Sequence, residues 1–175
     1  QPHMAWVENV RAGFAYPVTA TGIGVFVLIL VVVISRQIGI ATITACLAWA
    51  LHAGIGYLIG ATGGFFHSVL PFPVFIPALA LDLWLIIVFS RVKVFPLSKK
   101  ELFATTLFTA TVCYWAIICW VVLYTGSKLP QQLSGSLNDW LIWYAVFIPA
   151  MSYIIVQITS LISRWALQDK KHSFQ

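Results

Sequence analysis

The most constraining feature of this sequence is a series of five apolar runs, each long enough to cross a lipid bilayer. The cleanest run covers residues 16–35, about 20 residues, and at about 1.5 Å of rise per residue such a helix matches a hydrocarbon core about 30 Å thick. Because 61% of the residues are hydrophobic and only 9% are charged, the composition lies outside the range of soluble domains. The sequence therefore predicts an all-α membrane protein, a bundle of five transmembrane helices, whose other four spans are residues 38–63, 77–94, 101–125 and 139–165.

A single membrane domain accounts for nearly all of the chain. Strand-like alternation is absent and the runs are much longer than the roughly ten residues of a barrel strand, which argues against a membrane β-barrel. No internal repeat is detectable. We expect an interfacial N-terminal segment over residues 1–15, one transmembrane helical domain over residues 16–167, and a cytoplasmic tail over residues 168–175.

The positive charges predict the orientation of the chain. Once the spans are drawn, only Arg11 and Lys128 fall on one side of the membrane. The positive-inside rule then places the C-terminus in the cytoplasm and the N-terminus outside, in a cytoplasmic or intracytoplasmic membrane. Topology and attraction to anionic lipid account for the net charge of +5, and no basic run suggests a nucleic acid partner. The cations on the cytoplasmic side are Arg36, Arg91, Lys93, Lys99, Lys100, Arg164, Lys170 and Lys171.

Prolines and a glycine-containing turn predict how the first three helices connect. Arg36, Gln37 and Gly39 indicate a tight turn, so the first two helices should form an antiparallel hairpin. A proline disfavours the helical region for the residue before it, and Pro71 and Pro73 follow one another closely. We therefore expect an irregular, Pro-rich external connection before the third helix.

The last two helices have clearer boundaries. Ser98 and Glu101 form a capping box for the fourth helix, and Ser136 and Asp139 resemble one for the fifth. Pro149 lies inside the fifth helix, where the loss of one helical hydrogen bond predicts a kink.

Small residues inside the spans predict close packing rather than chemistry. A spacing of four in the second span predicts a face that a neighbouring helix can approach closely, at Gly56, Gly60 and Gly64. The cysteines lack Cys-x-x-Cys spacing and are expected to be small apolar core residues: Cys46, Cys113 and Cys119.

Few side chains in or near the spans could carry chemistry: Asp82, His52 and Gln157 within them, and His67 on an external connection. A lone Asp near the middle of a bilayer costs about 2.5–3.5 kcal/mol, so Asp82 must face protein or water. Two histidines and a carboxylate would suit a copper, zinc or iron site by ligand type, but their spacings match no metal motif. The alternative is structural, with His52 bonding a neighbouring helix and Asp82 neutral or paired with a polar group of another subunit.

Two segments resemble the A-type subunit of the particulate methane and ammonia monooxygenases, a family of copper membrane monooxygenases. Residues 72–83, FPVFIPALALDL, are similar to the family segment in which prolines lead into an Ala-rich helix bearing Leu-Asp. Residues 150–155, AMSYII, and 161–165, LISRW, are similar to the family's last helix, which ends in Arg-Trp on the cytoplasmic side. The chain departs from the bacterial pattern in having five spans rather than seven and a shorter loop before the last helix, which indicates a divergent short form.

The resemblance implies a membrane complex of A-type, B-type and C-type subunits, commonly a trimer of such trios, that oxidises ammonia, methane or a small hydrocarbon with dioxygen. In that family the copper ligands lie mainly on the B-type and C-type subunits, so no catalytic residue or metal ligand is transferred to this chain. It would serve as a scaffold and as a wall of the substrate cavity, with Asp82 as a hydrogen-bond anchor facing that interior.

Two other functions are compatible with the sequence. The chain could be a small transport component, such as the substrate-binding subunit of a vitamin uptake system, although it lacks internal symmetry and helix-breaking pairs. It could also be an accessory subunit of a respiratory complex, which would associate with a haem or quinone.

Overall fold

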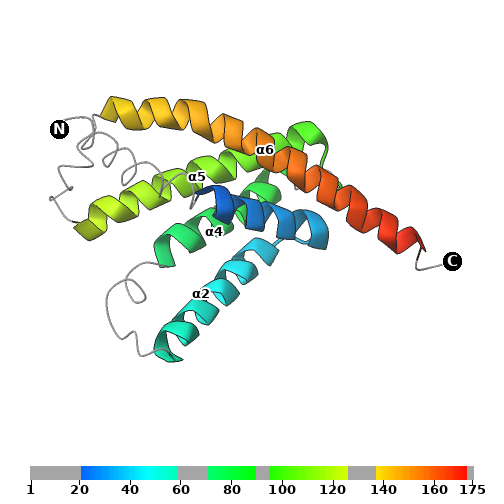
Figure 1. The fold of residues 1–175 in the computed structure, drawn as a ribbon, viewed down its shortest axis with the longest axis horizontal. Helices are drawn as coiled ribbons and strands as arrows, with labels where there is room; N and C mark the ends of the chain where they lie inside the picture. The colour runs from blue at the N-terminus through cyan, green and yellow to red at the C-terminus, as the bar shows by residue number, and fades with distance from the viewer. Residues whose placement is uncertain (1–20, 59–70, 90–94, 126–136, 173–175) are drawn as a thin grey trace, which may run out of the picture.

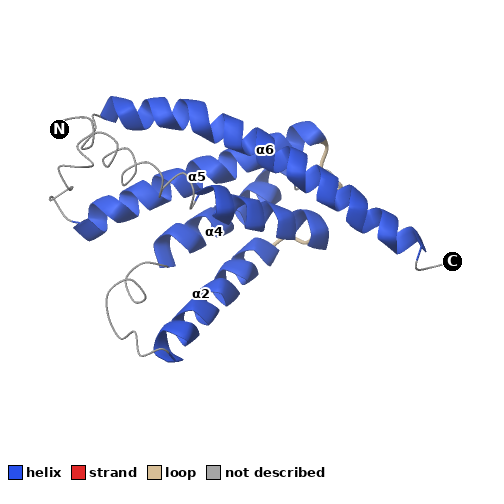
Figure 2. Cartoon of the chain, in the orientation of Figure 1, coloured by secondary structure: helices blue, strands red, loops and turns tan. Residues whose placement is uncertain are grey.

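A computed structural model describes residues 21–58, 71–89, 95–125 and 137–172, and every regular element in these ranges is α-helix. The predicted all-α class is therefore confirmed for this part of the chain (Figure 2). Two helical segments are long and apolar enough to cross a membrane, Lys99–Cys119 and Tyr144–Trp165. The helices are the Thr21–Ser35 helix, α2 (Ile40–Leu58), α4 (Pro71–Phe89), α5 (Lys99–Thr125) and α6 (Leu137–His172).

The labelled helices pack in a simple order (Figure 1). Helix α4 contacts α2 on one side and α5 on the other, and α5 also contacts α6. Trp84 of α4 stacks on Phe108 of α5 with ring centroids 4.4 Å apart, and its indole N–H donates a hydrogen bond to the Thr105 hydroxyl at 3.3 Å. Helix α4 is thus the central element of the α2–α4–α5 layer.

The Thr21–Ser35 helix packs its apolar face into the core. Val25, Ile29 and Val32 recur at the three- and four-residue spacing of one helix face, and all three are buried. At Gly22 this helix approaches α6 so closely that a Cβ atom there would lie 3.0 Å from the Sδ atom of Met151. Among the described positions, helix α2 contributes only its first two turns to the core, and those of its second half are exposed.

Two local predictions about chain connections are confirmed. After Ser35 a short turn, in which Arg36 has a φ of 55° and Gly39 a φ of 89°, leads into α2. At the start of α5 the Ser98 N–H donates to the Glu101 Oε2 at 2.7 Å, and the Glu101 N–H donates to the Ser98 Oγ at 3.3 Å. These reciprocal hydrogen bonds form the predicted capping box.

The expected irregular connection before the third helix is wrong from Pro71 onward, because α4 begins there and not at Pro77. The first four N–H groups of a helix have no acceptor within it, so Pro71 and Pro73 give up no hydrogen bond in the first turn. Pro77 lies inside the helix, which continues past it. The earlier part of the expected connection, residues 64–70, lies outside the described residues.

Helix α6 is longer than the predicted fifth span. It begins at Leu137, one residue after the proposed cap Ser136, and extends to His172, into the expected tail. Pro149 lies within it, and Figure 1 shows that the helix bends part-way along its length. The hydrogen bonds expected of Ser136, the interfacial segment 1–15, and Gly60 and Gly64 lie outside the described residues.

Candidate functional site

Asp82 lies on the side of α4 that faces the start of α2, and only 4% of its surface is exposed. One carboxylate oxygen, Oδ1, accepts a hydrogen bond from the Gly39 N–H at 2.9 Å. The other, Oδ2, accepts from the Thr42 N–H at 2.9 Å and from the Thr42 hydroxyl at 2.6 Å. The one acid on α4 is therefore bonded to the beginning of the neighbouring helix.

The sequence of α2 explains why it needs an outside partner. The Ile43 N–H donates to the Gly39 carbonyl at 3.1 Å, which makes Gly39 the N-cap residue of α2. An N-cap side chain normally accepts a hydrogen bond from the second or third helical N–H, but glycine has no side chain. Asp82 supplies that acceptor from α4, and its negative charge lies at the positive end of the α2 dipole.

This arrangement differs from the inter-subunit partner considered for Asp82, since all three donors belong to the same chain. Asp82 also lies against the end of α2 rather than its middle. Sequence reasoning missed Gly39 and Thr42 because they are 43 and 40 residues away from Asp82. One indication was available in the sequence: a glycine at the N-cap of an apolar helix provides no side-chain acceptor, so the acceptor must come from elsewhere.

Of the other candidate residues, Gln157 is the one whose side chain the structure describes, and it lies on a different helix from Asp82. Gln157 is half-buried on α6, a helix that does not contact α4. His52 belongs to α2, but its side chain lies outside the described residues, and so does all of His67. The hypothesis that these groups share one site stays a prediction.

No group of three or more His, Cys, Asp or Glu side chains is close enough to hold a metal ion within the described part of the chain. The cysteines do not behave alike there. Cys113 is buried, as expected, but Cys46 and Cys119 are exposed on the isolated chain. The prediction that all three are core residues is therefore wrong for these two, because α2 is exposed from Cys46 onward and Cys119 lies near the end of α5.

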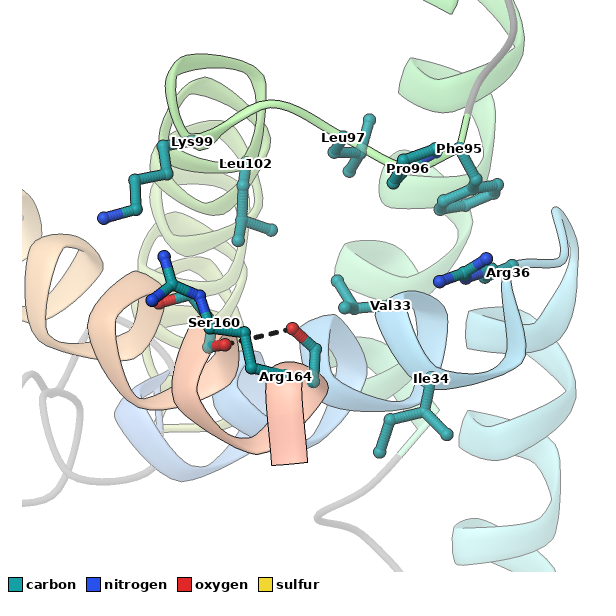
Figure 3. A pocket seen from close by; sticks show the side chains of 11 residues that line it. Val33, Ile34, Arg36, Phe95, Pro96, Leu97, Lys99, Leu102, Ser160 and Arg164 are labelled. Atoms are coloured by element: carbon teal, nitrogen blue, oxygen red, sulfur yellow. Dashed lines mark hydrogen bonds between the residues drawn. The ribbon is translucent and has the colours of Figure 1, made fainter. Parts of the chain in front are cut away.

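A second feature, which the sequence did not predict as a site, is a cavity of about 270 Å³ where the Thr21–Ser35 helix, the start of α5 and the last part of α6 meet. We call it the basic cavity. Arg36 directly follows the Thr21–Ser35 helix, Lys99 begins α5, and Arg164 lies on α6 (Figure 3). The remaining lining consists of two hydroxyl residues and six apolar ones: Ser160, Ser163, Val33, Ile34, Phe95, Pro96, Leu97 and Leu102.

The described charged side chains that line the basic cavity are all positive. None of its three cations forms an ion pair with an acid within the described ranges. The two acids whose side chains are described are already engaged, Asp82 with the start of α2 and Glu101 with the Ser98 N–H. In Figure 3 the charged ends of Lys99 and Arg164 lie on the same side of the cavity, while Arg36 extends toward it from the opposite side. Like charges gathered in this way favour an anion between them.

Comparison with known proteins gives no assignment: no protein-family model matches the chain, and neither a curated protein nor a solved structure matches it. The resemblance of residues 72–83 and 150–165 to the A-type subunit of the copper membrane monooxygenases therefore stays a prediction.

Proposed function

We propose that the chain is an integral membrane subunit of a copper-dependent monooxygenase complex, in which it acts as a scaffold and as a wall of the substrate cavity. The observation that carries this proposal is the set of hydrogen bonds that Asp82 accepts from the start of α2. The acid in the segment that resembles the A-type subunit is committed to three hydrogen bonds that hold α2 against α4. A carboxylate engaged in this way suits a structural role, with oxygen chemistry carried out by copper on B-type and C-type partners.

Insertion in a membrane is supported by the helices themselves. Beyond the two long apolar segments, α2 and α4 have 19 residues each, which corresponds to about 28 Å of helix. Large apolar side chains are exposed on them, including Leu58 at 83% and Ile87 at 74%. Exposure of such large apolar surfaces to water is unfavourable, so lipid or partner helices would cover them. The basic end of the bundle, with the C-terminus, would then lie in the cytoplasm.

The need for partners is supported by the uneven burial of the chain. Only 28% of the apolar segment of α6 is buried, compared with 56% of that of α5. The second half of α2 is exposed at every described position from Cys46 to Leu58. In the proposed complex these faces would contact lipid and the B-type and C-type subunits, in a trimer of heterotrimers.

The proposal is tested by purifying the complex from native membranes through a tag on this chain. We expect larger partner chains in the purified material by mass spectrometry, copper by elemental analysis, and oxidation of ammonia, methane or a small hydrocarbon with dioxygen. Extraction of the chain by alkaline carbonate would contradict its insertion in the membrane.

Two further outcomes would replace the proposed function. Tight binding of a small vitamin by the isolated chain, without copper or partners, would indicate a transport component. A haem or quinone that tracks the polypeptide would indicate a respiratory complex.

A further inference from the structure

We propose that the basic cavity binds the phosphate group of an anionic phospholipid. This inference rests on the proposed insertion of the chain in a membrane, but not on copper or on the partner subunits. The cavity is separate from the residues on which the proposed scaffold role depends, since Asp82 and its donors do not line it.

The charges of the basic cavity fit a phosphate diester. Arg36, Lys99 and Arg164 line the cavity, with Lys99 and Arg164 on one side and Arg36 on the other, and they have no acidic partner among the described residues. Arginine presents a planar fork of N–H donors to phosphate oxygens, and lysine adds a point charge. An anion bound here would offset the repulsion among three positive charges that line one cavity.

The hydroxyl groups of the two serines that line the cavity are not available as donors to an anion. The Ser163 hydroxyl donates to the Ser160 carbonyl at 3.1 Å, and the Ser160 hydroxyl donates to the Gln157 carbonyl at 2.9 Å. Both hydroxyl hydrogens are therefore used by the helix backbone. The N–H groups of the three cations that line the cavity therefore remain as donors for a ligand.

The apolar part of the lining favours a lipid over free phosphate. Val33, Phe95, Leu97 and Leu102 line the same space as the cations, and a small inorganic anion would leave them unused. The cavity volume of about 270 Å³ lies near the lower end of ligand sites, which suits a phosphate with its glycerol but not whole acyl chains. Ile34, which is 53% exposed at the rim, offers an apolar surface on which the chains could continue.

The location of the cavity agrees with such a ligand. Its cations belong to the set that the charge distribution assigns to the cytoplasmic face, and basic pockets between transmembrane helices on that face bind anionic lipid headgroups. The proposed occupant is therefore a lipid of the surrounding bilayer, held at the level of its headgroup.

The test counts the lipid molecules retained by the purified full chain in detergent, by native mass spectrometry after addition of phosphatidylglycerol or phosphatidylcholine. We expect retention of phosphatidylglycerol and not of phosphatidylcholine. Neutralising one cation should weaken retention by about fivefold, in each of the variants Arg36→Gln, Lys99→Gln and Arg164→Gln. Lys100→Gln is the matched control, because it removes the same charge next to Lys99 from a residue that does not line the cavity.

Several results would overturn the proposal. Equal losses in Lys99→Gln and Lys100→Gln would indicate diffuse attraction of anionic lipid to a basic surface. Displacement of phosphatidylglycerol by millimolar inorganic phosphate would identify the free anion as the ligand. Circular dichroism of each variant checks that the helices are intact, and the double variant Arg36→Lys with Arg164→Lys, which keeps the charges, should retain lipid even if a glutamine variant fails to fold. Absence of copper or partners in the purified complex would contradict the proposed function without affecting these results.

Discussion

At the scale of single residues, the hydrogen bonds of Asp82 join α4 to the start of α2. The Thr42 hydroxyl donates to Asp82, whereas the Thr44 hydroxyl donates to the Ile40 carbonyl of its own helix. A hydrogen bond to a charged group contributes about 1.5–3 kcal/mol, so Thr42→Val should lower the free energy of unfolding by about 1–2 kcal/mol. Thermal or denaturant unfolding of the detergent-solubilised chain measures this change.

Thr44→Val is the matched control for that prediction, since it removes a hydroxyl two residues away that has no partner on α4. Its effect should stay within about 0.5 kcal/mol. Thr42→Ser should restore the bond to Asp82 and most of the stability. If the two valine variants were equally stable, the carboxylate would not be joining the helices.

Gly39 combines two requirements in one position, a backbone φ of 89° and an N–H that donates to Asp82. A side chain at such a φ costs about 1–2 kcal/mol, so Gly39→Ala should lower the free energy of unfolding by that amount. Gly54 lies within α2, and a Cβ added there would have no atom within 4 Å. Gly54→Ala should therefore stabilise α2 by up to about 1 kcal/mol. Opposite signs in the same unfolding assay are the expected result, and equal signs would argue against the turn geometry.

At the scale of secondary-structure elements, the start of α5 depends on the capping box. Ser98→Ala removes the acceptor of the Glu101 N–H and should lower the free energy of unfolding by about 1 kcal/mol. Hydrogen exchange of the Glu101 amide should accelerate, because that N–H then has no acceptor. Lys100→Ala changes the same turn without touching the box, and an equal effect of the two variants would show that the cap contributes nothing.

At this scale, the sequence predicts interactions between residues close together in the chain better than interactions between residues far apart. The capping box was predictable, because its residues are three positions apart and their chemistry is specific. The start of α4 was not, because a proline disfavours helix at the residue before it but is tolerated in the first helical turn, and the two effects oppose each other at Pro71 and Pro73. The need to shelter Asp82 was evident from the cost of burying charge, but its donors lie 40 or more residues away, and no local pattern encodes that pairing.

At the scale of the whole molecule, the chain has an ordered interior and unpartnered apolar surfaces. The Thr21–Ser35 helix, α4 and α5 supply most of the buried apolar side chains, while α2 leaves the body of the bundle after its first two turns. Asp82 fixes where α2 begins. From Cys46 to Leu58 every described position of α2 is exposed, although Trp49 keeps a ring contact with Phe75 of α4. A scaffold of this kind would leave the bundle rigid and present α2 to a neighbour.

The cysteines allow that last idea to be tested without disturbing the fold. Cys46 is exposed at the beginning of the uncovered half of α2, and Cys113 is buried in α5. In a Cys119→Ser variant of the isolated chain in lipid nanodiscs, N-ethylmaleimide should modify Cys46 slowly, because the reagent acts on thiolates and these form less readily away from water. Cys113 should stay unmodified until the chain unfolds. Mass spectrometry of the two cysteine-containing peptides measures both rates.

The same reaction on the complex purified from native membranes, in the same nanodiscs, isolates the effect of partner chains from that of lipid. If another subunit packs on α2, the modification of Cys46 should slow by at least about tenfold, because a packed interface excludes the reagent as a protein interior does, while Cys113 stays protected in both samples. An unchanged rate at Cys46 would mean that α2 faces lipid in the complex, and the partner contacts would then lie on other exposed faces, such as those of α4 and α6.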